Sequence, residues 1–268
     1  MTDVYKSSAN ALLSKLLLGI MLKKTATHYY MPNLTKIITI ISLLISSMAH
    51  SEPPKNFSTA KRIASKLFSS APYTLYCHCE YDKYKKIDLN SCGMNKAKKV
   101  KRARRVEWEH MMPVSSYVKH FQCGREKLCT KKNGKRYGGR KCCEKVDKAF
   151  QRAESELYNL WPSVGLVNGS RRDYQYAMLD NSQPFFGCEF KVDKGTRKVE
   201  PDNSAKGIVA RASLFMSEKY HIRLSKSQRK MFESWDKLNP PTKRELEWAQ
   251  KVAAIEGYSN PYITRHQG

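Results

Sequence analysis

The sequence has few acidic residues for its length. Only 24 of its 268 residues are Asp or Glu, whereas 49 are Lys or Arg, which gives a formal net charge of +25. Because this excess is spread along the chain rather than confined to a tail, we expect a large polyanion as the partner. Nucleic acid is the first candidate, and an anionic membrane surface is the second.

Several patterns that indicate other classes of protein are also absent. There is no internal repeat, no long low-complexity segment and no break in composition between residues 55 and 263, which favours a single domain over an array. No H-E-x-x-H string occurs, which argues against a zinc metalloprotease. The 41% of hydrophobic residues are enough to bury a core, which excludes wholesale disorder.

The apolar run near the N-terminus is too short for a membrane span, which needs about 20 predominantly apolar residues. Residues 31–49 carry Lys36 before this run and end with Ser47 and Ala49 at an A-x-A-like spacing, as secretory signal peptides do. A buried helix is the alternative. It is disfavoured because the apolar character stops abruptly at the polar, proline-containing residues 50–54.

These observations divide the chain into three parts. Residues 1–30 are an uncertain upstream extension, residues 31–49 are the expected signal peptide, and residues 50–268 are the mature domain. The first 49 residues contain five Lys and one Asp, so the mature charge is 25 minus 4, or +21. We expect the mature protein to be periplasmic or secreted, monomeric and without stable membrane insertion.

The cysteines are even in number and confined to one part of the chain, which favours disulfides in an oxidising compartment. Zinc is the alternative, but Cys77, His78 and Cys79 are poorly spaced for a structural zinc site. Cys142 and Cys143 are adjacent, and they are not expected to form a disulfide with each other. The candidate disulfide cysteines are Cys77, Cys79, Cys92, Cys123, Cys129, Cys142, Cys143 and Cys188.

Apolar spacing predicts the main helices. We expect one over residues 57–69, with Ser58 available as N-cap, and another that reaches Asn159. Between them, the aromatic and cysteine-rich residues 73–79 indicate a short strand pair pinned by disulfides.

The C-terminal third also favours helices. Ser225 with Gln228, and Thr242 with Glu245, have the spacing of capping boxes ahead of apolar stripes. Together these patterns predict an α+β fold in a single domain with a helical C-terminal third.

Three short elements could carry out chemistry on a phosphodiester. Glu109 and His110 end a strand-like segment, Arg140 follows two glycines in a basic loop, and Asn159 ends a helix. Hydrolysis needs a base to activate water, a group that offsets charge on the phosphate, and a stabilised leaving oxygen. A histidine, an arginine and an oxygen-ligated cation supply these functions, and one or two carboxylate or amide oxygens are enough to hold Mg²⁺.

Each element alone has an ordinary structural explanation: a surface dipeptide, a solvated arginine and a helix cap. The basic run at residues 96–105 is likewise most often a solvated face. Because it directly precedes the strand-like segment, we expect it to contact phosphate.

The full segments resemble the endonuclease I family of secreted and periplasmic bacterial nucleases. The matching strings are RVEWEHMMPVSSY at 105–117, GGRKCC at 138–143 and ESELYNLWPSVGLVNGSRR at 154–172, and the resemblance extends from about residue 54 to 261. It implies a ββα-metal core, also called a His-Me finger, with disulfide-linked loops. It also implies Mg²⁺-assisted cleavage of DNA, and often RNA, with little sequence preference.

The resemblance implies a role for each site residue. Glu109 and Asn159 match metal-binding residues, His110 matches the general base, and Arg140 matches the phosphate-stabilising arginine. The implied cofactor is Mg²⁺, with other divalent cations as alternatives. A non-catalytic, basic, secreted nucleic-acid-binding protein would explain the charge, but it would not explain why these four residues occur together in matching strings.

The chain also departs from the family pattern. Between Cys123 and Gly138 it carries an insertion of roughly ten residues that contains Cys129, and Cys142 is an extra cysteine. We therefore expect an additional Cys129–Cys142 disulfide. Tyr158 occupies the position where relatives commonly have histidine. The hydrogen bonds around the neighbouring Asn159 are therefore expected to differ from those of the family.

Overall fold

The structure, a computed structural model, describes residues 52–180 and 183–267. The expected signal peptide at residues 31–49 and the upstream extension lie outside the described residues. Within the described part of the chain, no helix combines the length and apolar character that a membrane span needs.

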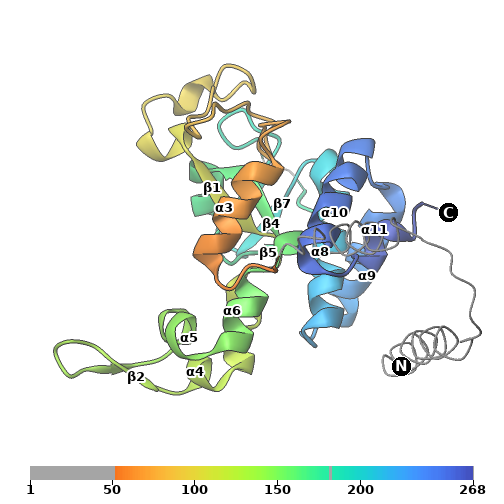
Figure 1. Cartoon of the computed structure of the whole chain (residues 1–268). Coiled ribbons are helices and arrows are strands. Elements are labelled where there is room, and N and C mark those ends of the chain that lie inside the picture. The colour runs from red at the N-terminus through yellow and green to blue at the C-terminus, as the bar shows by residue number, and fades with distance from the viewer. Residues whose placement is uncertain (1–51, 181–182, 268) are drawn as a thin grey trace, which may run out of the picture. The chain divides into compact units, whose positions relative to one another are not determined.

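The centre of the fold is the predicted ββα unit. Strand β1 (Val106–His110) pairs antiparallel with β4 (Leu160–Val164), and the two strands are in register along their whole length. Helix α7 (Gly165–Arg171) begins directly after β4. Segments about fifty residues apart in sequence are therefore adjacent in space, and the α+β assignment is confirmed (Figure 1).

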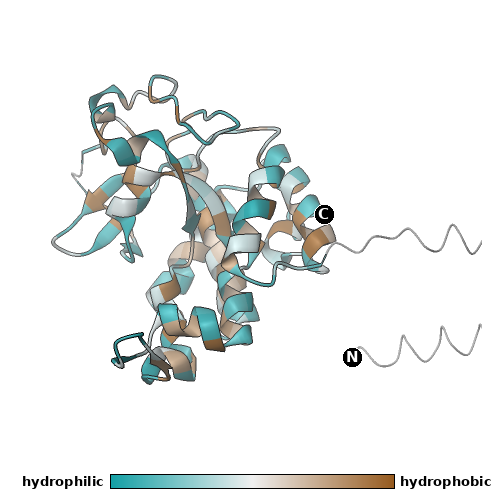
Figure 2. Ribbon diagram, turned by 60° about the vertical axis from the view of Figure 1, so that its left-hand side comes forward, coloured by the Kyte–Doolittle hydropathy of each residue, from teal (hydrophilic) through white to brown (hydrophobic). Residues whose placement is uncertain are grey.

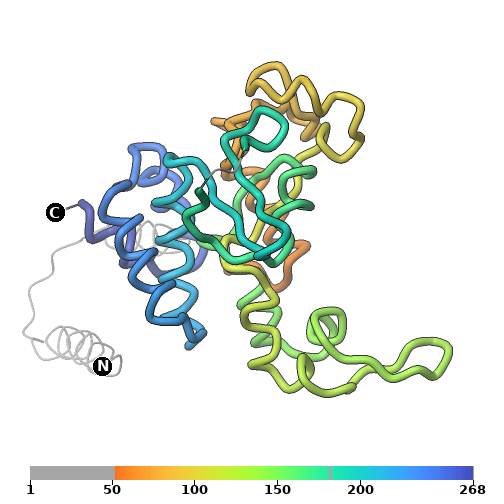
Figure 3. The backbone as a smooth tube through the Cα atoms, turned by 180° about the vertical axis from the view of Figure 1, so that it is seen from behind, coloured from red at the N-terminus to blue at the C-terminus, as the bar shows by residue number. Residues whose placement is uncertain are grey.

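The chain between β1 and β4 forms a separate lobe of short elements, drawn in green in Figures 1 and 3. Its hairpin, β2 with β3, projects away from the rest of the protein in both views. In chain order the elements are η3 (Val114–Ser116), η4 (Val118–His120), α4 (Gln122–Arg125), β2 (Cys129–Thr130), β3 (Arg136–Tyr137), α5 (Arg140–Val146), α6 (Lys148–Glu154) and η5 (Leu157–Asn159).

The remaining elements lie around the ββα unit. Those after β7 are helices, so the predicted helical C-terminal third is confirmed. A three-stranded sheet has the order β5-β7-β6. These elements are α3 (Phe57–Leu67), η1 (Asn95–Ala97), η2 (Lys101–Arg104), β5 (Gln175–Tyr176), β6 (Lys191–Asp193), β7 (Lys198–Glu200), α8 (Asn203–Lys219), α9 (Lys226–Leu238), α10 (Lys243–Glu256) and α11 (Pro261–Thr264).

Two apolar clusters hold these parts together. The larger one joins the ββα unit to α3 and the C-terminal helices, and the Trp161 and Trp248 rings meet in it with centroids 4.4 Å apart. The smaller one joins the lobe to the end of α8 through Phe150, Met216 and Ile222. Figure 2 shows hydrophilic and hydrophobic residues on the same helices, as expected for amphipathic helices around a core.

All eight cysteines are paired. The disulfides are Cys77–Cys188, Cys79–Cys92, Cys123–Cys143 and Cys129–Cys142. The predicted additional bridge is therefore confirmed, and the adjacent cysteines bond to different partners. Because no cysteine is free, the alternative of a cysteine-based zinc site is wrong.

Three local predictions were wrong or incomplete in the N-terminal half. The N-cap of α3 is Asn56, which accepts a hydrogen bond from the Thr59 amide, and Ser58 lies inside the helix. The segment 73–79 forms only isolated bridges, so its disulfides rather than a strand pair fix it. The helix expected to reach Asn159 ends at Glu154, and a separate 3-10 turn follows.

One of the two predicted capping boxes is complete. Ser225 and Gln228 exchange both hydrogen bonds at the start of α9. Thr242 caps α10, but the Glu245 carboxylate instead binds Arg211 in the core, at 2.8 Å from its Nε. The buried guanidinium therefore takes the side chain that the spacing assigned to the cap.

Candidate active site

Strand β1 ends with two polar side chains that leave it on opposite faces, because adjacent residues of a strand alternate in direction. His110 lies against Phe57 of α3 and Glu154 of α6. Glu109 lies on the other side, against Tyr76 and Arg171. The strand thus supplies one candidate residue to each side.

His110 is buried and fixed in one orientation. Its Nε2 lies 2.8 Å from the backbone oxygen of Glu154, and the Phe57 ring packs on its ring with centroids 4.8 Å apart. A carbonyl oxygen can only accept, so Nε2 carries the proton and Nδ1 holds the lone pair. Burial lowers the pKa of His110 to about 3, so the imidazole is neutral at neutral pH.

Arg140 reaches the same place from the start of α5. Its Nε lies 2.6 Å from a carboxylate oxygen of Glu154, and its guanidinium lies over the Phe57 ring. Glu154 therefore holds both candidate catalytic residues, one through its backbone and one through its side chain. The two terminal nitrogens of Arg140 make no hydrogen bond with the described residues, and the side chain is 40% exposed, so they are free to meet a phosphate.

The two glycines before Arg140 are required by the backbone. Gly139 has a φ of 79°, in the region that favours glycine, and it precedes the first turn of α5. A side chain at Gly138 would place its Cβ 2.2 Å from the backbone oxygen of Glu126. These two constraints fix the backbone that leads into α5, and therefore the position of Arg140 at the start of this helix.

Glu109 is buried beside a cation. Its Oε1 lies 3.2 Å from Nη1 of Arg171 and 3.4 Å from the Tyr76 hydroxyl. Burial raises the pKa of Glu109 to about 7, although Arg171 and Tyr76 oppose the shift. Its Oε2 makes no hydrogen bond with any described residue.

Asn159 lies at the end of the turn that precedes β4. Its side-chain oxygen accepts from the Met112 amide at 2.7 Å, and its side-chain nitrogen donates to the Met112 carbonyl at 3.0 Å. Its backbone oxygen also accepts from the Met111 amide. Asn159 therefore fixes the two residues that follow His110.

The structure thus brings His110 and Arg140 together, while Glu109 and Asn159 contact other partners. Among the described residues there is no cluster of three or more His, Cys, Asp or Glu side chains that could hold a metal ion. A Mg²⁺ ion needs fewer protein ligands than this. Oε2 of Glu109 and the second lone pair of the Asn159 side-chain oxygen are hard donors of the kind that fit it.

Sequence reasoning missed three residues of the site: Phe57, Glu154 and Arg171. Arg171 is buried and donates to the carbonyl oxygens of His110 and Met111, at 3.1 Å and 2.7 Å. It therefore fixes the end of β1 as well as contacting Glu109. The family-like string from 154 to 172 contains Glu154 and Arg171, but nothing in it marks them as site residues.

Tyr158, the departure from the family pattern, points away from the site. Its hydroxyl donates to the backbone oxygens of Ala249 and Tyr258, at 3.3 Å and 3.2 Å, and its ring contacts Trp248 edge-on. It ties the turn before β4 to the C-terminal helices.

In the basic run at residues 96–105, two arginines form salt bridges with a neighbouring glutamate. Arg102 and Arg105 both form salt bridges with Glu107 of β1, at 2.6 Å and 2.8 Å. The carboxylate holds these cations against the strand that ends at His110.

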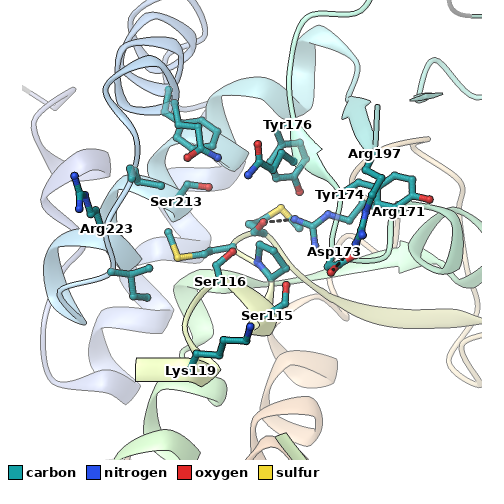
Figure 4. A pocket seen from close by; sticks show the side chains of 18 of the residues that line it. Ser115, Ser116, Lys119, Arg171, Asp173, Tyr174, Tyr176, Arg197, Ser213 and Arg223 are labelled. Atoms are coloured by element: carbon teal, nitrogen blue, oxygen red, sulfur yellow. Dashed lines mark hydrogen bonds and ion pairs between the residues drawn. The ribbon is translucent and has the colours of Figure 1, made fainter. Parts of the chain in front are cut away.

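A cavity of about 730 Å³ borders the turn after β1. Figure 4 shows Ser115, Ser116 and Lys119 on one side of it, Arg171 and Arg197 on another, and Arg223 on a third. Arg197 is paired with Asp173 at 3.0 Å, whereas Lys119 and Arg223 form no salt bridge in the described ranges. The cavity therefore presents cations and hydroxyl groups, which suits an anionic chain.

Comparison with known proteins gives a consistent result. A family model described as Endonuclease I matches residues 54–267. Endonuclease-1 of Buchnera aphidicola subsp. Acyrthosiphon pisum (strain APS) is 40% identical over 216 residues, which cover 79% of this chain and 82% of the relative. An extracellular and a periplasmic deoxyribonuclease of Aeromonas hydrophila are 35% and 34% identical, each over 84% of this chain and 95% and 92% of theirs.

Proposed function

The chain belongs to the endonuclease I family, and on this premise we propose that it is a secreted or periplasmic endonuclease that hydrolyses DNA with a divalent cation. The observation that carries the proposal is the joint attachment of His110 and Arg140 to Glu154. The names of the Aeromonas relatives support both the substrate and the compartment.

His110 is the general base. Its proton lies on Nε2, so Nδ1 takes the proton from the attacking water. The carbonyl of Glu154 fixes this tautomer, and the ring of Phe57 packs against the imidazole and holds its orientation. Because the imidazole is already held in one orientation, little conformational entropy is lost when it forms a hydrogen bond with the attacking water.

Arg140 binds the scissile phosphate through its two terminal nitrogens. The fork of the guanidinium matches two phosphate oxygens, and its charge offsets the charge that develops during attack. Glu154 orients this side chain without occupying the fork, since it contacts only Nε.

Glu109 and Asn159 would hold Mg²⁺ through Oε2 and the side-chain oxygen. When bound, the cation stabilises the negative charge on the leaving oxygen. Arg171 keeps Glu109 in place through its contact with Oε1, and Asn159 keeps the turn after His110 in place. None of these contacts depends on the sugar, so RNA is a second candidate substrate, and the cavity beside this turn supplies phosphate contacts for flanking nucleotides.

Incubating the oxidised protein of residues 50–268 with supercoiled plasmid, single-stranded DNA and RNA, with and without EDTA, tests the proposal. We expect DNA cleavage that EDTA abolishes. Binding to all three substrates without EDTA-sensitive cleavage would contradict it and would favour the non-catalytic alternative.

A further inference from the structure

The β2–β3 hairpin carries a concentrated positive charge that the site described above does not use. From Lys127 to Arg136 the chain has five basic residues and no acidic residue. At the tip, the side chains of Lys131, Lys132 and Lys135 are exposed and form no salt bridge with any residue in the described ranges. Their charges are therefore not neutralised within the described fold.

The hairpin is an ordered arm rather than a loose loop. Its strands pair Cys129 with Tyr137 and Thr130 with Arg136, and the Lys131 amide donates to the Lys135 carbonyl at 2.9 Å. It has almost no apolar side chain to bury, so the disulfide between Cys129 and Cys142 fixes its base.

The arm and the candidate active site share one covalent support. Strand β3 leads through two glycines directly to Arg140, and Cys142 lies two residues further along the same helix. Cys143, the next residue, forms a disulfide with Cys123, which precedes the arm in sequence. The position of the arm is therefore coupled to the position of Arg140.

We propose that the β2–β3 hairpin is a second contact surface for duplex DNA, where Lys131, Lys132 and Lys135 bind backbone phosphates distant from the one that is cleaved. The proposal rests on the proposed function. An extended strand advances about 3.3 Å per residue, which puts Lys135 up to roughly 17 Å from Arg140. Along the axis of a duplex each strand carries one phosphate per about 3.4 Å, so the contacts lie within about five base pairs of the cleaved phosphate.

The composition of the hairpin tip favours binding to DNA over binding to a membrane surface. Residues 131–136 are KKNGKR, without an aromatic or aliphatic side chain to enter a lipid interface. Peripheral membrane binding usually combines charge with an apolar face, whereas duplex DNA can be held by phosphate contacts alone.

Charge removal at the tip tests this surface. The variant Lys131→Gln/Lys132→Gln/Lys135→Gln is compared with Lys226→Gln/Lys230→Gln/Lys237→Gln, which removes three exposed charges from α9 that likewise form no salt bridge among the described residues. Both are titrated in EDTA across a salt series with duplexes of about 30 and about 6 base pairs. Each phosphate contact contributes about −0.9 to the slope of log K against log salt.

On the long duplex, we expect the slope to weaken by about 2 to 3 for the hairpin variant and by less than about 1 for the α9 control. On the short duplex, which extends only about 20 Å and so barely reaches from one surface to the other, the difference between the two variants should be smaller than on the long duplex. A Cys129→Ser/Cys142→Ser variant keeps the charges but loosens the arm, and it should bind the long duplex less tightly than wild type. Far-UV circular dichroism confirms that each variant is folded.

Equal slopes for the two triple variants would overturn the proposal. So would loss of binding to phosphatidylglycerol vesicles with an unchanged DNA slope, which would make the arm a membrane contact. The readout is separate from cleavage. Hairpin-dependent binding without Mg²⁺-dependent cleavage would refute the proposed function alone, and cleavage with hairpin-independent binding would refute this surface alone.

Discussion

His110 donates a hydrogen bond from Nε2 to the backbone carbonyl oxygen of Glu154, at 2.8 Å. The carboxylate of the same residue holds Arg140 at 2.6 Å. The proposed general base and the proposed phosphate-binding arginine are therefore positioned by one residue at the end of α6.

Glu154→Gln should lower kcat by about 10-fold, because the weaker contact lets Arg140 move while the backbone acceptor of His110 remains. Glu144→Gln is the matched control. Glu144 also contacts Nε of Arg140, at 3.1 Å, but it is more exposed, and its loss should change kcat little. Steady-state cleavage of a labelled duplex measures both. An equal effect of the two variants would show that Glu154 has no special positioning role.

Glu109→Ala and Asn159→Ala should each raise the Mg²⁺ concentration needed for half-maximal cleavage, because each removes an oxygen donor to the cation. Glu107→Ala is the control on the same strand, since its carboxylate is engaged by Arg102 and Arg105. The measurement is a Mg²⁺ titration of the initial rate. If neither Glu109→Ala nor Asn159→Ala shifts the titration, the cation binds elsewhere.

Reduction of the disulfides should lower activity before the C-terminal helices unfold. Cys123–Cys143 and Cys129–Cys142 fix the first turns of α5, where Arg140 lies, whereas α8 to α11 contain no cysteine. Cleavage and far-UV circular dichroism are recorded in parallel as dithiothreitol is increased. Full activity of the completely reduced protein would contradict this expectation.

Arg211→Met should destabilise the protein by about 3 to 5 kcal/mol, because it leaves the buried carboxylate of Glu245 without its cation and removes one of the cations that pair with buried Asp236. Arg197→Met removes an exposed pair with Asp173 and should cost no more than about 1 kcal/mol. Urea unfolding measures both free energies. Similar losses in the two variants would show that burial of the Arg211 cluster does not set its contribution.

Local signals in the sequence were sufficient where one segment determines its own structure. The segment that ends in Glu109 and His110 forms a strand, and the Ser225–Gln228 box starts α9 where the spacing places it. The disulfide between Cys129 and Cys142 could be predicted only from the resemblance to the endonuclease I family, because both the inserted segment and the additional cysteine are departures from the pattern of that family.

The parts that could not be predicted depend on contacts between distant residues. Phe57 is more than fifty residues from His110, and only the packing of α3 brings the two rings together. Arg171 reaches Glu109 because α7 folds back on β1. Glu245 has the right spacing to complete a cap, but its salt bridge with buried Arg211 determines where it lies.

The central claim is that His110 is the base, and the initial rate of plasmid cleavage by His110→Ala tests it most directly. His120→Ala, which changes an exposed histidine of the neighbouring turn, is the control. We expect His110→Ala to cleave about 10² to 10⁴ times more slowly than wild type, with most DNA affinity retained, and His120→Ala to cleave at the wild-type rate. Wild-type turnover by His110→Ala would contradict the account.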